Sequence, residues 1–239
     1  MLSTVKFDNI LFLDIETVPQ YASPDEVPEP YKRLWEKKSS YFRKENETAA
    51  DAYRRAGIYA EFGKVICLST GMLGYRNQIP CFRIVSFSGD REEDILTGFK
   101  SLLEKIAHSR DMLLCAHNGK EFDFPFLARR FLVHGFDLPE ILDLWGKKPW
   151  EIKHLDTMEL WKFGDHKHYT SLELMAALFN IPSPKTDIDG SLVAEVYYQH
   201  KDLPRIVEYC QRDVITIAQI IRRFKGEPLL LDENIEIVG

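Results

Sequence analysis

Apolar residues along this chain recur with two periods, the short runs of β-strands and the longer stripes of α-helices. Apolar runs of strand length occupy residues 10–16, 65–70, 81–87 and 112–116, and a fifth, shorter candidate covers residues 153–156. Helical spacing and end signals predict helices over residues 90–108, 123–134, 170–179, 190–200 and 202–224. The order strand, strand, strand, helix, strand favours a mixed sheet, so we expect an α/β fold.

Glycines mark two of the predicted turns. Gly71 and Gly74 separate the second and third strands, and this short connection favours an antiparallel meander that runs back from the first strand. Gly119 gives the turn after the fourth strand its backbone freedom. Thr170 fits a capping box at the start of the next helix, and the tail from Glu227 is a short extension without a predicted role.

Residues 19–62 interrupt the alternation of strands and helices. Several prolines lead into a charged segment that is rich in aromatic side chains. We expect an irregular, partly helical insertion between the first and second strands. A cap that packs its aromatic residues on the core is favoured over a flap that closes on a substrate.

Composition narrows the class of protein. The 239 residues are enough for one good-sized core, so one domain over 1–239 with this insertion is favoured over two. The net charge of −6 argues against a broad basic surface for non-specific duplex binding, although it is compatible with a nucleic-acid enzyme whose metal ions meet the phosphate. No basic leader and no apolar run of membrane-spanning length is found, so neither secretion nor membrane insertion is predicted. The cysteines contain no CxxC pair, and we expect reduced core thiols in a cytoplasmic protein: Cys67, Cys81, Cys115 and Cys210.

Two carboxylates close the first predicted strand. Asp14 and Glu16 are two residues apart and therefore share one face, whereas Leu13 and Ile15 pack on the other. Like charges this close stay ionised together only with a cation between them, and oxygen ligands favour Mg²⁺ or Mn²⁺. The alternative is an exposed strand end whose acidic residues meet solvent.

Further acidic residues follow later elements. Asp123 comes after the fourth strand, where it is either a helix N-cap or a third carboxylate at the end of a central strand; neither interpretation excludes the other. Tyr209 and Asp213 share one face of the last long helix, unless they are an exposed pair on a solvated surface. Asp156 is either a supporting acid or an ordinary strand-end aspartate.

Basic and histidine residues supply a second set of candidates. Residues 162–169 are the most plausible phosphate or base contact outside the carboxylates, through Lys162, His166, Lys167, His168 and Tyr169. The histidines at 154, 166 and 168 suggest zinc, but no Cys or Glu stands at ligand spacing, so a zinc site is not expected.

Three of these segments together resemble a known set of motifs. Asp14-Ile15-Glu16-Thr17, then residues 118–123, then Tyr209-x-x-x-Asp213 resemble the three exonuclease motifs of the DEDD superfamily. The tyrosine four positions before the last aspartate resembles the DEDDy branch, and the residues around each motif are most similar to the proofreading exonuclease domain of family B DNA polymerases. The similarity runs from about residue 9 to 224 and covers 19–62 only weakly. Without room for palm or fingers domains, the chain resembles a stand-alone exonuclease.

The resemblance implies a ribonuclease H-like fold, with a five-stranded mixed sheet, its first three strands antiparallel and helices on both faces. It implies that two divalent cations, Mg²⁺ or Mn²⁺, bind to Asp14, Glu16, Asp123 and Asp213. It further implies that Tyr209 holds the attacking water. Candidate substrate-binding residues are, by analogy, Thr17, Asn118 and Phe122.

Physical chemistry agrees with this assignment. Two ions about 3.5–4 Å apart lower the pKa of a bound water and stabilise the leaving oxygen, and four carboxylates match their charge. A tyrosine with an ordinary pKa near 10 is a poor base, so orientation of the water suits Tyr209 better. A single-stranded end fits best, because the terminal phosphate must enter the carboxylate cleft and bases can stack on Phe122.

We therefore expect a 3′-5′ exonuclease that releases nucleoside monophosphates from single-stranded DNA ends. DNA is favoured over RNA, but an exoribonuclease like ribonuclease D is the nearest alternative. A catalytically inactive nucleic-acid-binding module and a small-molecule phosphodiesterase are the other two. The sequence identifies no protein partner.

Overall fold

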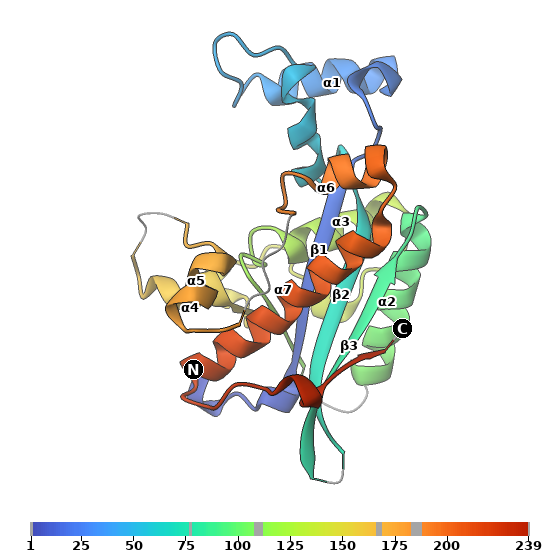
Figure 1. The fold of residues 1–239 in the computed structure, drawn as a ribbon. Helices are drawn as coiled ribbons and strands as arrows, with labels where there is room; N and C mark the ends of the chain where they lie inside the picture. Colours follow the sequence, from blue (N-terminus) through green and yellow to red (C-terminus); the bar gives the residue numbers. More distant parts are fainter. Residues whose placement is uncertain (1, 77, 108–111, 166–168, 183–187, 239) are drawn as a thin grey trace.

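The computed structural model describes residues 2–76, 78–107, 112–165, 169–182 and 188–238 (Figure 1). Their sheet has the strand order β5-β4-β1-β2-β3-β6. Strands β1 to β3 pair antiparallel, while β4 with β1, β5 with β4, and β6 with β3 pair in parallel. The mixed α/β fold and the antiparallel start are therefore confirmed. The strands are β1 Ile10–Pro19, β2 Gly63–Arg76, β3 Ile79–Ser88, β4 Leu113–Ala116, β5 Leu155–Asp156 and β6 Ile235–Val238.

The sheet of the described residues has one strand more than the predicted five. The additional strand, β6, lies in the tail beyond Glu227 and pairs with residues 82–85 of β3. Arg83 of β3 and Glu236 of β6 form an ion pair at 3.3 Å. Because β3 would otherwise present an unpaired edge, the tail completes the sheet.

The hairpin of β2 and β3 is longer than predicted. Gly71 and Gly74 do not separate the strands, because antiparallel pairing continues through both glycines. Gly71 is needed for space: a Cβ there would lie 2.4 Å from Cζ of Phe82 and 2.8 Å from Cγ1 of Val214. The missing side chain lets a helix pack closely on the sheet.

The α-helices are α1 Glu29–Ser39, α2 Glu92–Ala107, α3 Asp123–Val133, α4 Thr157–Lys162, α5 Leu172–Leu178, α6 Val193–Glu195 and α7 Leu203–Phe224. Shorter helical turns are η1 Leu2–Thr4, η2 Phe7–Asn9, η3 Pro24–Glu26, η4 Asp51–Ile58, η5 Glu140–Leu142, η6 Pro149–Glu151, η7 Val196–His200 and η8 Asp232–Asn234. The N-cap of α5 is Ser171, whose Oγ accepts the Leu174 N–H at 3.2 Å, so the capping box predicted to begin at Thr170 is wrong by one residue. No helix in the described parts of the chain is long and apolar enough to cross a membrane.

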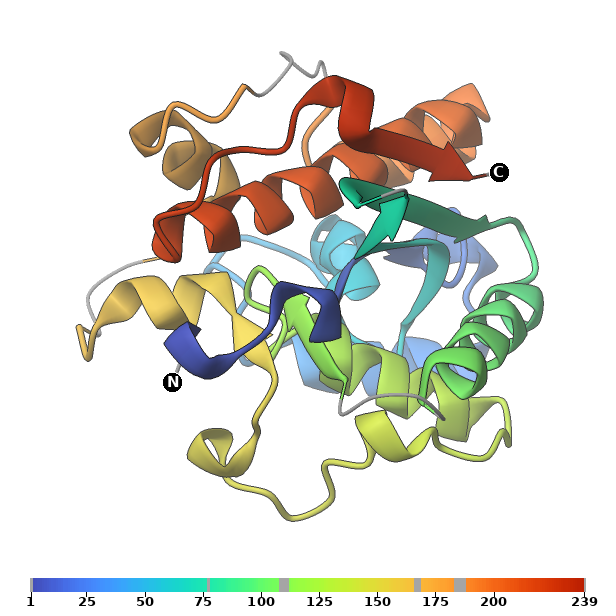
Figure 2. The same cartoon turned by 90° about the horizontal axis from the view of Figure 1, so that it is seen from below.

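Alternation along β1 gives the sheet two different faces. Leu11, Leu13 and Ile15 pack with α2 and α3, whereas Ile10 and Phe12 pack with α7. Figure 2 shows α7 on one side of the strands and α2 with α3 on the other. The even-numbered positions of β1 that follow Phe12 therefore point towards α7.

Residues between β1 and β2 build a small core of their own, away from the sheet (Figure 1). Trp35 of α1 is at its centre, with the rings of Tyr53 and Phe62 at 5.8 and 5.2 Å, and its Nε1 donates to the Ala49 carbonyl at 2.8 Å. The sequence predicts that these aromatic residues pack on the core of the sheet. This prediction is wrong, because they pack against one another. The segment therefore forms its own packed unit next to the end of β1 (Figure 1).

Candidate active site

The first two candidate carboxylates lie on the α7 face of β1. Asp14 pairs across the ladder with Ser69, and Glu16 pairs with Cys67. The ladder shifts register between Glu16 and Thr17, directly after the second carboxylate. Glu16 is 7% exposed, which excludes the alternative of an acidic strand end in solvent.

Helix α7 brings the third motif against β1. Cys210 is fully buried, and its Sγ donates to the backbone carbonyl of Asp14 at 3.3 Å, so the helix docks at the first carboxylate. Tyr209 and Asp213 are half-buried one turn apart, and their side chains are hydrogen-bonded to each other. They are therefore not an exposed surface pair.

The loop after β4 leads to Asp123, the third candidate carboxylate. Asp123 is 2% exposed and is the first residue of α3, so the N-cap position belongs to Phe122. The left-handed residue of the turn is Asn118, with φ 63°, and not Gly119. Gly119 is required for close packing instead, because a Cβ there would lie 2.4 Å from the Cβ of Ala116.

Asp156 fixes this loop. Its buried carboxylate accepts the backbone N–H of Asn118 at 3.0 Å and of Lys120 at 3.1 Å. It also caps α4 by accepting the backbone N–H groups of Met158 and Glu159 at 3.0 and 3.2 Å. Asp156 thus positions the loop that leads to Asp123, which is more than an ordinary strand-end aspartate does.

Four acidic side chains, here called the carboxylate cluster, influence one another electrostatically: Asp14, Glu16, Asp123 and Asp213. Burial raises the pKa of Asp14 well above its usual value, and repulsion from the other three members raises it further. Burial likewise raises the pKa of Glu16, of Asp123 to about 8, and of Asp213 to about 7. The hydrogen bond from Tyr209 acts in the opposite direction on Asp213. The cluster therefore carries protons at neutral pH unless cations compensate its charge.

The cluster fits a divalent cation. Oδ2 of Asp14 and Oδ1 of Asp123 are buried without a hydrogen-bond partner. Orphaned buried oxygens are costly, and a metal ion satisfies them. Asp14, Glu16 and Cys210 also offer ligand atoms within 4.8 Å of one another. Cys210 was not predicted here, because it falls on the apolar stripe of its helix; only its place beside Tyr209 hinted at the site.

A cavity of about 380 Å³ opens beside Glu16. Two predicted substrate-binding residues line it, Thr17 and Phe122, together with Arg54 from η4. Asn118, the third, does not line it; its Nδ2 donates to the hydroxyl of Tyr169 at 3.4 Å. The structure therefore divides the three predicted residues between two places.

The basic segment at 162–169 is described only at its ends. His166, Lys167 and His168 lie outside the described residues. The Tyr169 hydroxyl donates to Glu121 at 3.2 Å next to Asn118. Both ring nitrogens of His154 are engaged, Nδ1 with the N–H of Leu114 and Nε2 with the carbonyl of Ile141, so this histidine is not available to zinc.

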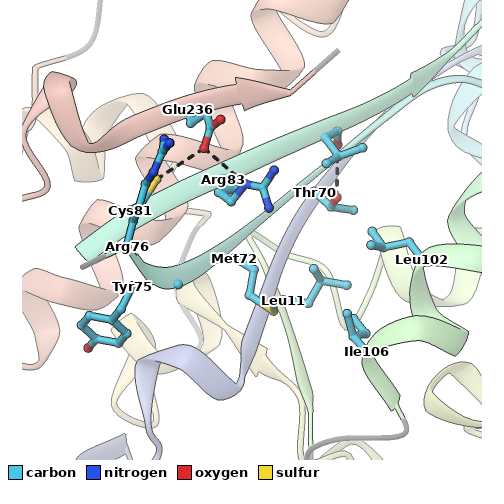
Figure 3. A pocket seen from close by; sticks show the side chains of 12 residues that line it. Leu11, Thr70, Met72, Tyr75, Arg76, Cys81, Arg83, Leu102, Ile106 and Glu236 are labelled. Carbon is cyan, nitrogen blue, oxygen red and sulfur yellow. Dashed lines mark hydrogen bonds and ion pairs between the residues drawn. The ribbon is translucent and has the colours of Figure 1, made fainter. Parts of the chain in front are cut away.

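A larger cavity of about 610 Å³ lies elsewhere, between β2, β3 and the end of α2 (Figure 3). Leu11, three residues before Asp14, and Leu102 and Ile106 of α2 line it, and Arg83 and Glu236 pair at its edge. None of the predicted site residues lines this cavity. Although it is larger than the cavity beside Glu16, it is therefore not the candidate active site.

The mixed sheet and the helices on both its faces define a ribonuclease H-like α/β protein. Residues 58–226 match the family described as predicted 3′-5′ exonuclease related to the exonuclease domain of PolB, and the chain belongs to this family. Asp123 and Tyr209-x-x-x-Asp213 lie inside the matched residues, while β1 precedes them.

Solved structures support the same fold. The family B DNA polymerase from the hyperthermophilic archaeon Pyrobaculum calidifontis matches with a TM-score of 0.53 over 90% of this chain, at 15% sequence identity. The chain spans 24% of the length of that polymerase. A comparison with curated proteins gives no match.

Proposed function

We propose that the protein is a metal-dependent 3′-5′ exonuclease that hydrolyses phosphodiester bonds at single-stranded DNA ends and releases nucleoside monophosphates. The carboxylate cluster is the observation that carries this proposal. Its members come from three distant segments, all have raised pKa values, and two of them present buried oxygens without partners. Such a cluster is costly by itself, and it becomes favourable around divalent cations.

The cluster would hold two divalent cations, Mg²⁺ or Mn²⁺. When bound, such ions supply an acidified water and a counter-charge for the scissile phosphate. The protein positions the ligands: Asp14 and Glu16 by the strand, Asp213 by its hydrogen bond to Tyr209, and Asp123 by the loop that Asp156 holds. Burial raises the pKa of Tyr209 far above its usual value, so its hydroxyl stays protonated and orients the attacking water rather than deprotonating it.

The side of the cavity lined by Thr17 and Phe122 would take the terminal nucleoside, which leaves the side lined by η4 to the rest of the strand. Thr17 lines it next to the carboxylates, and the ring of Phe122 is held by Phe126 with centroids 5.5 Å apart. A held aromatic ring is a stacking surface for a base of any sequence. A single-stranded end suits this site, because a base must leave a duplex to reach the ring.

The proposal is tested by digestion of 5′-labelled single-stranded DNA and RNA of one sequence, with Mg²⁺, Mn²⁺ or EDTA. We expect a ladder that shortens from the 3′ end with metal and full-length strand with EDTA. Asp14→Ala should abolish the ladder, while Asp232→Ala, which removes an exposed carboxylate far along the chain in η8, should not.

Three results would contradict the proposal in whole or in part. Near-normal cleavage by the Asp14→Ala variant would remove the assignment of the carboxylate cluster. Binding of both strands without cleavage under any metal would favour a binding module. Faster cleavage of RNA than of DNA would move the substrate to the ribonuclease D-like alternative without changing the site.

A further inference from the structure

The cavity beside the carboxylate cluster is built partly from the segment between β1 and β2. Glu16 and Thr17 line it from β1, Phe122 from the start of α3, and Arg54 and its neighbours from η4. Its volume of about 380 Å³ lies within the range of about 300–1,000 Å³ that is usual for ligand sites. A ligand in this cavity therefore meets both Glu16 and η4.

The two arginines of η4 differ in what holds them. Arg55 is engaged, since its Nη2 donates to Oε1 of Glu47 at 2.7 Å and its guanidinium lies 4.8 Å from the centroid of the Phe42 ring. Arg54 is exposed, and within the described parts of the chain its guanidinium has no hydrogen bond or ion pair. Its charge contributes to the lowered pKa of Asp189, but the main cause there is hydrogen bonding from Ser191. Arg54 is thus a cation available to a ligand.

The backbone that carries Arg54 is held firmly. Tyr53 and Ala56, on either side of it, are buried in the small core around Trp35. Gly57 lies against the end of β1, where an added Cβ would be 3.1 Å from the backbone of Val18. Both contacts fix η4 relative to the carboxylates, so the cation is placed by packed structure.

Charge indicates which ligand group suits Arg54. The carboxylate cluster would serve the phosphate that is cleaved, whereas the further phosphates of a single-stranded substrate would need other cations. The chain as a whole is acidic, with a net charge of −6, so an unengaged arginine in the substrate cavity is significant.

We propose that Arg54 binds a phosphate of the substrate strand other than the one that is cleaved, which makes η4 part of the strand-binding surface. This inference rests on the proposed function. It concerns a residue outside the matched family segment, which begins at residue 58, so it assigns a role to the part of the chain that the family does not describe.

The test measures binding of the full-length protein to a fluorescent single-stranded DNA oligonucleotide. Ca²⁺ replaces the catalytic metal, and 3′-terminal phosphorothioate linkages prevent cleavage. Dissociation constants are measured between 50 and 300 mM NaCl for wild type, Arg54→Gln and Arg54→Lys. Arg33→Gln is the matched control, because Arg33 is an exposed arginine of α1 in the same segment that does not line the cavity. Thermal midpoints verify that each variant is folded.

We expect Arg54→Gln to lower the magnitude of the slope of log affinity against log salt by about 0.7, the value for one single-strand phosphate contact. At 0.1 M salt this slope corresponds to about fivefold weaker binding. Arg54→Lys should keep most of the affinity, and Arg33→Gln should behave as wild type. Deoxythymidine monophosphate, used as a competitor, has a single phosphate and so offers Arg54 no second one. Its affinity should therefore not change in Arg54→Gln.

The outcomes are distinguishable. Oligonucleotide binding that is unchanged in Arg54→Gln would overturn this inference alone. An equal loss of affinity for the oligonucleotide and for the mononucleotide would also overturn it, because the contact would then not be to a second phosphate. A wild-type protein that binds no oligonucleotide would overturn both this inference and the proposed function.

Discussion

Replacing Asp156 by alanine tests whether one buried carboxylate organises the loop that leads to Asp123. Oδ1 of Asp156 accepts three backbone N–H groups, and Oδ2 accepts the N–H of Lys120. Asp156→Ala removes all four acceptor contacts at once. Because the residue is 2% exposed, water does not easily take its place.

The magnitude follows from these contacts. Loss of the helix cap costs about 1 kcal/mol. The two loop amides, left without an acceptor, add about 1 kcal/mol each at the low end for buried donors. The sum of about 3 kcal/mol corresponds to a fall of about 6–12 °C in Tm for a chain of this size. Asp156→Asn keeps Oδ1 and loses only the Lys120 contact, so about one third of the effect is expected.

The assay is urea unfolding, followed by cleavage under conditions where the variant is folded. Asp202→Ala is the matched control, because Asp202 caps α7 through a single hydrogen bond to the Arg205 N–H at 3.2 Å and should cost about 1 kcal/mol. Displacement of the loop should lower metal affinity or cleavage about 10–100-fold in Asp156→Ala. Equal destabilisation by both alanine variants, with normal cleavage, would show that Asp156 does not organise the loop.

Three further predictions concern the core, the tyrosine and the protons of the site. Arg130→Met should destabilise the protein by about 3–5 kcal/mol in urea unfolding, because it removes the arginine that balances the charge of the buried Glu92 carboxylate, which Arg130 contacts at 2.9 Å; a loss below 1 kcal/mol would contradict this. Tyr209→Phe should reduce kcat about tenfold at unchanged KM, whereas a loss of 10²–10⁴-fold would indicate proton transfer by the tyrosine. The pKa of Asp123 is raised from 3.8 to about 8 and that of Asp213 to about 7, so the metal-free folded state binds more protons than the unfolded chain between about pH 4 and 8. The Tm of the metal-free protein should therefore fall as pH rises through this window. Mg²⁺ should offset this fall, and the double variant D123N/D213N should flatten it. A metal-free Tm that rises with pH over the same window would contradict the raised pKa values of Asp123 and Asp213.

Local periodicity was sufficient to predict the parts of the site that lie on regular elements. Asp14 and Glu16 share a face because side chains alternate along a strand, and Tyr209 and Asp213 share one because residues four apart lie together on a helix. The short spacing within each motif fixes these relations before any tertiary structure forms. In the structure Asp14 and Glu16 alternate with Ile15 along β1, and Tyr209 and Asp213 lie one turn apart on α7.

Contacts between distant segments could not be predicted in the same way. Asp156 looks like many strand-end aspartates, and only the folded chain brings the amides of Asn118 and Lys120 to it. The pairing of β6 with β3 joins residues about 150 positions apart, so the sixth strand left no local signal. Gly71 was interpreted as a turn because the sequence does not show the Phe82 ring that occupies its side-chain space.

The segment between β1 and β2 combines both situations. Its aromatic residues indicated a packed unit, but the prediction that they pack on the core of the sheet is wrong, because they form a separate core. The place of Arg54 in the cavity depends on how that small core meets the end of β1. A single sequence contains no pattern that predicts how this small core packs on the end of β1.

The most direct test of the account is anomalous diffraction from crystals of the wild-type protein grown with Mn²⁺ and a nucleoside monophosphate. We expect two Mn²⁺ ions among the carboxylates of Asp14, Glu16, Asp123 and Asp213, about 3.5–4 Å apart, with the phosphate of the nucleotide between them and its nucleoside in the cavity beside Glu16. Nucleotide bound without Mn²⁺ at these carboxylates, or Mn²⁺ held at another part of the chain, would contradict it.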